Sequence, residues 1–271
     1  MTDRSEVMPG SAYIALPDGA YQSSSLTRGP WDHQHQHAGP PSALVCGAIE
    51  RHAAEREFSH ISRITANLLR PVPIAELVVE VTDDYVGRNA GHFSARLIAG
   101  GKEVARFTAL AQRENAVALP EGLPGHPLPV VAQGPDDSAQ QHFPFAGRHV
   151  GYNDLVEVRV ARGELFNGPC AIWFRLRHPL LDGETPSAYQ RVAVAADSGN
   201  GISAILDFKR YSFVNSDLTI NLLRQPRGEW ICLDARTLFG PNGCGLAESA
   251  LYDQDGLIGR ATQSLSLRLR T

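Results

Sequence analysis

The sequence lacks several features that would point to particular classes of protein. No run reaches the roughly 18 consecutive apolar residues of a membrane-spanning helix. Its first ten residues lack a basic segment followed by an apolar one, so we expect a cytoplasmic rather than a secreted protein. The cysteines are few and contain no C-x-x-C pair, which predicts buried thiols without disulfides or a zinc knuckle. They are Cys46, Cys170, Cys232 and Cys244.

A strong charge of one sign is also missing. The net charge is −4 over 271 residues and no basic run occurs, which argues against a nucleic-acid partner or an anionic membrane. Hydrophobic residues make up 43% of the chain, as in a globular protein with a buried core. We therefore expect a small-molecule partner.

An internal repeat is the main positive signal. With an offset of 154 residues, Asn67-Leu68-Leu69-Arg70 overlays Asn221-Leu222-Leu223-Arg224, and further residues match without a gap. Repetition of this length indicates a duplicated unit. A stretch rich in proline and glycine lies between the copies and is typical of a linker. The predicted segments are an N-terminal unit at 1–113, a linker at 114–146 and a C-terminal unit at 147–271.

Each copy combines one apolar helix with a series of strands. The helices are expected at 42–52, after Gly39-Pro40-Pro41, and at 189–197, after Pro186-Ser187-Ala188. The strands are expected at about 61–70, 76–86, 92–99 and 103–112, and again at 216–224, 229–238, 246–253 and 257–269. A sheet of such strands can enclose the apolar helix, and two sheets can pair edge to edge. The predicted fold is α+β, a tandem double hot-dog in which each unit wraps an antiparallel β-sheet around one long central helix.

Polar residues in apolar surroundings mark a candidate site. Gln263 lies on the apolar face of the last strand, where Ala109 occupies the matching position of the first copy. A buried amide needs partners, either backbone groups or a functional site. Asp197 ends the second helix, where the helix dipole disfavours a carboxylate by about 0.3–1 kcal/mol. It is either a solvated end residue or a base near a cleft. Both features belong to the second copy, so we predict one working site.

Two further segments carry polar residues. In Asn215-Ser216-Asp217, strand alternation predicts that Ser216 faces the core and that its two neighbours face away. Before the first helix, His33, His35 and His37 alternate, but no cluster of carboxylates or cysteines completes a metal site, so no metal is expected. Asp32 and His37 are five residues apart, the spacing of a hydratase dyad.

Four motifs resemble one known family. They are Trp-x-His followed by His-Ala-Gly-Pro-Pro-Ser-Ala from Trp31, Ala-Ala-Asp ending at Asp197, Asp-Leu-Thr-Ile-x-Leu-Leu-Arg from Asp217, and Tyr-Asp-Gln-Asp-Gly-Leu-Ile-Gly-Arg-Ala-Thr-Gln ending at Gln263. With them the chain resembles the acyl-CoA thioesterase II (TesB-like) family of tandem hot-dog proteins. This resemblance covers most of the sequence apart from the linker.

The resemblance implies hydrolysis of acyl-CoA thioesters to free acid and CoA, without a cofactor. A water would be held by an Asp, a Gln and a hydroxyl residue, positions that fall on Asp197, Gln263 and Asn215, with Ser216 beside the last. Asn215 departs from the expected hydroxyl. A helix N-terminus would polarise the thioester carbonyl. Since Pro40 and Pro41 lack N–H groups, Gly39 or Ser42 would donate.

Two alternative functions stay open at the level of sequence. One is a hot-dog hydratase or dehydratase that uses Asp32 and His37. The other is an acyl-CoA-binding protein without catalysis. In each case the expected partner is an acyl-CoA, with no nucleic acid and no membrane, and the candidate oligomer is a dimer of double hot-dogs.

Overall fold

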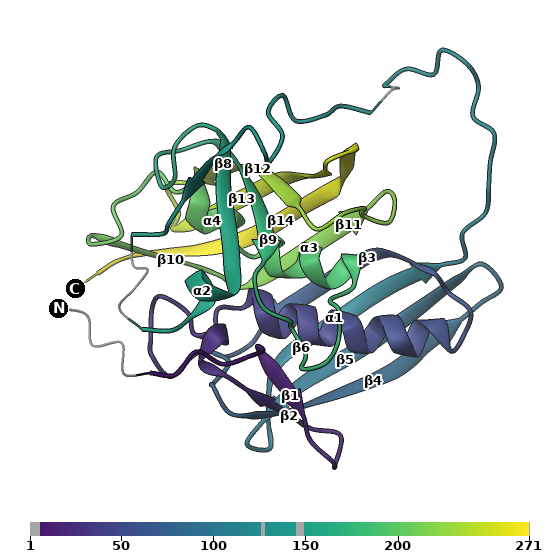
Figure 1. The fold of residues 1–271 in the computed structure, drawn as a ribbon, viewed down its shortest axis with the longest axis horizontal. Coiled ribbons are helices and arrows are strands. Elements are labelled where there is room, and N and C mark those ends of the chain that lie inside the picture. Colours follow the sequence, from purple (N-terminus) through teal and green to yellow (C-terminus); the bar gives the residue numbers. More distant parts are fainter. Residues whose placement is uncertain (1–5, 126–127, 145–148, 271) are drawn as a thin grey trace.

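The computed structural model describes residues 6–125, 128–144 and 149–270. These residues form one antiparallel sheet of 14 strands, and two helices from the two halves of the chain lie side by side against it (Figure 1). The strands follow one another in the order β1-β2-β4-β5-β6-β3-β11-β14-β13-β12-β9-β8-β7, and β10 pairs with β14.

The element bounds are as follows. The strands up to the linker are β1 (Tyr13–Ala15), β2 (Tyr21–Ser23), β3 (His60–Leu68), β4 (Glu76–Val86), β5 (Ala90–Ala99) and β6 (Lys102–Gln112). The later strands are β7 (Ala139–Gln141), β8 (Val156–Arg162), β9 (Cys170–Leu176), β10 (Tyr211–Asn215), β11 (Asp217–Leu222), β12 (Ile231–Phe239), β13 (Cys244–Asp253) and β14 (Gly256–Leu269). The α-helices are α1 (Gly39–Ala54), α2 (Tyr152–Leu155), α3 (Ala188–Ala196) and α4 (Gly199–Ile202).

Both predicted helices are present. Helix α1 takes in Pro40 and Pro41 in its first turn, where a missing N–H costs no hydrogen bond. Helix α3 is capped by Ser187, whose hydroxyl accepts from the Gln190 N–H while the Gln190 side chain accepts from the Ser187 N–H. No helix of the described residues is both long and apolar enough to cross a membrane.

The two helices approach closely at one point. A Cβ atom on Gly39 would lie 2.6 Å from the Val194 carbonyl oxygen, so only glycine fits there. The contact brings the beginning of α1 next to the end of α3. The segment before α1 therefore lies close to Asp197, the C-cap of α3.

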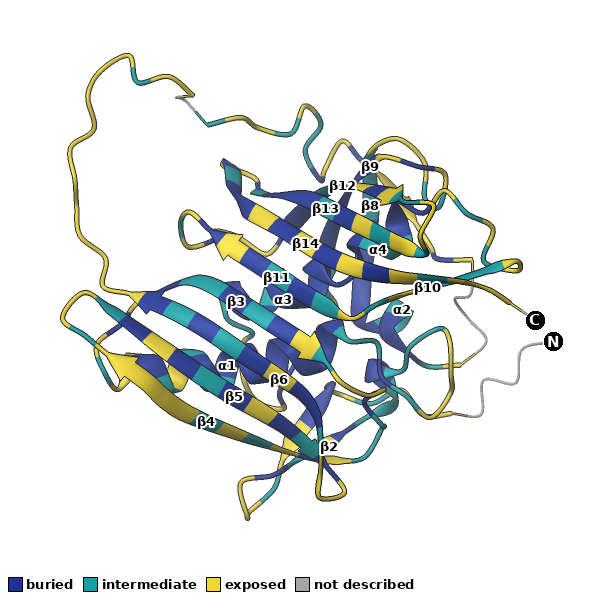
Figure 2. Cartoon of the chain, turned by 180° about the vertical axis from the view of Figure 1, so that it is seen from behind, coloured by how far each residue is buried: buried dark blue, intermediate teal, exposed yellow. Residues whose placement is uncertain are grey.

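The predicted repeat appears in the strand order. The order β3-β6-β5-β4 of the first half recurs as β11-β14-β13-β12 in the second. Strands β3 and β11 pair antiparallel along the junction (Figure 2). Thr65 lies opposite Thr219, and their hydroxyl oxygens are 3.1 Å apart. These two residues are 154 positions apart, so the repeat places equivalent residues opposite each other. All eight expected strands and the edge-to-edge pairing are confirmed.

Several elements had no prediction. Strands β1, β2 and β7 have three residues each, too few for an alternating pattern. Strand β7 lies within the segment expected as linker and pairs with β8. The expectation of four buried thiols was wrong for Cys244, which is exposed, while the other three are buried and all four are free.

Candidate active site

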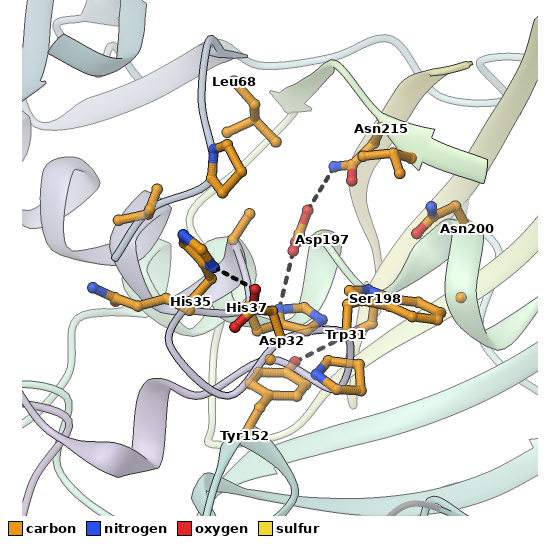
Figure 3. A pocket seen from close by; sticks show the side chains of 18 of the residues that line it. Trp31, Asp32, His35, His37, Leu68, Tyr152, Asp197, Ser198, Asn200 and Asn215 are labelled. Carbon is orange, nitrogen blue, oxygen red and sulfur yellow. Dashed lines mark hydrogen bonds and ion pairs between the residues drawn. The ribbon is translucent and has the colours of Figure 1, made fainter. Parts of the chain in front are cut away.

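A cavity of about 470 Å³ opens where the two halves meet. Its wall combines the segment before α1, the loop after β3, helix α4 and strand β10 (Figure 3). The aromatic lining residues are Trp31, Phe143, Tyr152, Phe166, Phe208 and Phe213. The polar ones are Asp32, His35, Gln36, His37, Arg70, Asp197, Ser198, Asn200, Asn215 and Ser216. This volume and mostly apolar wall are typical of a small-molecule site.

Asp197 is the buried carboxylate of this wall. Its side chain is only 5% exposed, and Oδ2 lies 3.0 Å from Nδ1 of His37. Its Oδ1 accepts from the amide nitrogen of Asn215 at 2.8 Å and from that of Gln263 at 3.3 Å. A buried carboxylate is tolerated when donors surround it in this way. Asp197 is therefore held in one orientation from three sides.

Gln263 joins Asp197 to the following helix. Its amide nitrogen also donates to the Asp197 backbone carbonyl at 3.1 Å, and its amide oxygen accepts from the Asn200 N–H at 3.0 Å. Gln263 is 2% exposed and does not line the cavity. Backbone groups therefore satisfy much of the amide, which also contacts the Asp197 carboxylate, and a role of Gln263 in a functional site stays a prediction. Ala109 in the first half cannot make these bonds.

Asn215 reaches Asp197 because the chain between β10 and β11 has one residue more than the segment of β14 that it pairs with. Asn215 lies opposite Leu265 of β14, whereas Thr219 lies opposite Thr262, so four steps on one strand match three on the other. An extra residue reverses the faces of the side chains beyond it. The expectation that Ser216 faces the core and Asn215 faces away was therefore wrong. Ser216 is exposed and lines the cavity beside Asn215.

His37 is fixed by a second residue that the sequence did not indicate. Its ring stacks on Tyr152 with centroids 3.8 Å apart and an angle of 4° between the planes. The Tyr152 hydroxyl donates to the Val194 carbonyl at 2.9 Å and lies 2.9 Å from Oγ of Ser198. Burial raises the pKa of Tyr152, which keeps the phenol neutral and able to donate. No sequence pattern links residues 37 and 152.

Asp32 and His37 of the possible hydratase dyad have different partners. Asp32 pairs with His35 at 3.1 Å, and its other oxygen accepts from the Gln34 N–H. The segment turns at these residues instead of running extended, so the three histidines do not share one face. His33 packs against His149, while His37 pairs with Asp197. In the described part of the chain, no group of three or more His, Cys, Asp or Glu side chains is arranged to hold a metal.

Gly39 and Ser42 do not reach the cavity wall. The Gly39 N–H points at Nδ1 of His37 at 3.2 Å, and the Ser42 N–H donates to the Ala38 carbonyl at 3.1 Å. Neither residue lines the cavity. The structure therefore does not bring these two expected oxyanion donors to the site.

Comparison with protein families identifies the chain. Residues 27–112 match the acyl-CoA thioesterase N-terminal domain, and residues 129–267 match the acyl-CoA thioesterase C-terminal domain. The chain belongs to the acyl-CoA thioesterase family. Membership makes it a thioester hydrolase. A search of curated proteins finds no match.

Solved structures of similar shape share the hot-dog fold. A hot-dog protein of unknown function from Alicyclobacillus acidocaldarius has 18% identity and a TM-score of 0.72, with 97% of each chain covered. A candidate thioesterase II from Thermobifida fusca YX has 13% identity and a TM-score of 0.74, with 96% of each chain covered. The acyl-CoA thioesterase II TesB2 from Mycobacterium marinum has 16% identity and a TM-score of 0.64, covering 96% of this chain and 95% of its own. At these identities the likeness establishes the fold of this thioesterase.

Proposed function

We propose that this thioesterase hydrolyses acyl-CoA thioesters to free acid and CoA at Asp197. The observation that supports this most directly is the convergence of Asn215, Gln263 and His37 on one buried carboxylate beside an aromatic cavity. The aromatic wall suits an acyl group. The polar cluster suits a water that attacks the thioester carbonyl, because fixed donors and acceptors lower the cost of ordering that water.

Asn215 supplies the polar group where a hydroxyl was expected. Its amide nitrogen donates to Asp197, and an amide oxygen can accept from a water in the cavity. Gln263 acts through Asp197 rather than on the water, since it lies behind the cavity wall. We therefore assign Asn215 to the water and Gln263 to positioning the carboxylate.

Asp197→Asn tests the assignment because it removes the charge and keeps the shape. We expect kcat/KM to fall by at least about 10²-fold, as when acid–base catalysis is lost. Release of free CoA thiol would be measured across short, medium, long and aromatic acyl-CoAs. Asp32→Asn is the comparison, since Asp32 faces the same cavity but pairs with His35.

The outcomes separate the alternatives. If Asp32→Asn loses activity and Asp197→Asn keeps it, the chemistry takes place at Asp32, as in the hydratase alternative. Binding of acyl-CoA without turnover of any ester would favour a binding protein and contradict the proposal.

We also propose a tandem double hot-dog, with units at 1–113 and 147–271 joined through 114–146, and each sheet wrapped around its own helix. Matching strand order in the two halves supports it. A single working site is supported by a second cavity of only about 10 Å³, lined mainly by apolar residues such as Ile61, Ile64 and Ile220. A cytoplasmic location and a dimer stay predictions.

A further inference from the structure

His37 presents one free edge of its ring to the cavity. Asp197 holds Nδ1 at 3.0 Å, and Tyr152 covers one face of the ring at 3.8 Å. The side chain is 15% exposed and forms part of the cavity wall. Its Nε2 has no hydrogen-bond partner within residues 6–125, 128–144 and 149–270. The ring is thus fixed on two sides and open at the nitrogen opposite Asp197.

The carboxylate itself has little capacity left for a water. A carboxylate offers about four lone-pair sites. Asn215 and Gln263 donate to Asp197, Nδ1 of His37 lies 3.0 Å from its Oδ2, and only 5% of its side chain is exposed. A water in the cavity therefore meets the imidazole edge more readily than the carboxylate.

The position of the ring proton follows from the charges. Nδ1 faces both the Asp197 carboxylate at 3.0 Å and the Gly39 N–H at 3.2 Å, and one tautomer cannot satisfy both contacts. A proton on Nδ1 gives a charge-assisted bond to a buried carboxylate, which is the stronger of the two. Without that proton, a ring lone pair and a carboxylate oxygen would face each other. The Nδ1–H tautomer leaves Nε2 as a proton acceptor.

We propose that His37, through Nε2, is the general base of the hydrolysis and that Asp197 is its positioning residue. This rests on the proposed thioesterase function. As water oxygen bonds to the thioester carbonyl carbon, one water proton moves to Nε2 and the carbonyl becomes an oxyanion. When the oxyanion collapses, the carbon–sulfur bond breaks and the proton passes from Nε2 to the CoA sulfur. Asp197 orients the ring and stabilises the transient imidazolium.

Charged groups on several elements surround the ring, and Asp197 is in contact with it. Asp197 faces it from the end of α3 and Tyr152 from α2, while Asp32 and His35 on its own segment and Arg70 after β3 line the same cavity.

The test compares the wild type with His37→Asn and His37→Gly on an acyl-CoA that the wild type hydrolyses. Asn can still donate to Asp197 from the Nδ1 side but cannot act as a base. We expect kcat to fall by about 10² to 10⁴ in both variants, with KM within a few-fold. We also expect added imidazole to restore part of the activity of His37→Gly. His33→Asn is the matched control, because the His33 ring packs against His149 and does not line the cavity. This variant should keep full activity.

The results distinguish a failure of the His37 assignment from a failure of the proposed thioesterase function. Full activity of His37→Asn, or a loss that imidazole does not restore, would overturn the proposal while thioesterase activity of the wild type stands. Rescue of His37→Gly by added imidazole is the second measurement, because only a folded variant with room for an imidazole base can be rescued. Absence of hydrolysis by the wild type with every acyl-CoA would instead remove the proposed function.

Discussion

At the scale of single residues, Asp197 shows how a carboxylate is stabilised at an unfavourable position. A carboxylate at the end of a helix meets the negative end of the helix dipole. Here the side-chain donors of Asn215, Gln263 and His37 offset that cost. Removing one donor from a buried charge is costly because the charge keeps its burial and loses its partner. We therefore expect substitutions around Asp197 to affect stability as well as activity.

Asn215→Asp makes that expectation specific. The change places a second carboxylate about 2.8 Å from Asp197, and two such groups cannot both ionise without strong repulsion. We expect kcat/KM at pH 8 to fall by about 10²-fold, compared with about 10-fold for Asn215→Ala, which removes the donor to Asp197 and the amide oxygen assigned to the water. The thermal midpoint of Asn215→Asp should lie below that of the wild type at pH 8, because two carboxylates would then face each other in a buried site. Equal midpoints at pH 8 would contradict this account.

At the scale of elements, the contact between α1 and α3 contains a half-buried acid. The Glu50 carboxyl of α1 accepts from the hydroxyl of Ser187, the cap of α3, at 2.5 Å. Burial raises the pKa of Glu50 to about 7, although Ser187 and the guanidinium groups of Arg51 and Arg191 oppose the shift. This group lies outside the cavity wall, so its titration bears on stability.

The sign of the Glu50 effect follows from proton binding. Between pH 4.5 and about 7 the folded state keeps a proton that the unfolded state releases, so stability falls as the pH rises through this window. The loss is at most about 3 kcal/mol, from about 1.36 kcal/mol per unit of pKa shift. In Glu50→Gln we expect the free energy of unfolding in urea to change less between pH 5 and pH 8 than in the wild type. Glu55→Gln, at an exposed site of the same helix, is the control and should keep the wild-type slope. An unchanged slope in Glu50→Gln would rule out this role.

At the scale of the whole molecule, one sheet runs through both halves. Strands β3 and β11 join them, and Ile64 lies opposite Ile220 with both side chains buried. The cavity takes its wall from both halves as well. Such continuity predicts that the halves unfold together.

Substitutions at the junction test this cooperativity. Ile64→Ala and Ile220→Ala should each lower the free energy of unfolding by about 2–5 kcal/mol, and their effects should not add because the side chains are neighbours. Calorimetry should show one transition that moves to lower temperature in both variants. Leu246→Ala on β13, at an exposed position, should move it little. Two separate transitions would show that the halves unfold independently.

Sequence alone determined the scaffold of this thioesterase. Period-two alternation and the 154-residue offset predicted eight strands, and an apolar stretch with a proline start predicted each helix. Alternation and apolar stretches are local patterns, and the offset is a repeat, so all of them can be recognised without knowing how the helices and strands pack. Asp197 and Gln263 stood out because a polar residue in an apolar pattern is visible in the sequence.

Tertiary structure alone decided the partners at the site. One extra residue before β11 turned Asn215 toward Asp197, and a turn at Asp32 paired it with His35. His37 met Asp197 and Tyr152 because the beginning of α1 lies against the end of α3 at Gly39. Both contacts of His37 join residues more than 100 positions apart, and their geometry depends on how whole elements pack. Periodicity describes the faces of each element but not which faces meet.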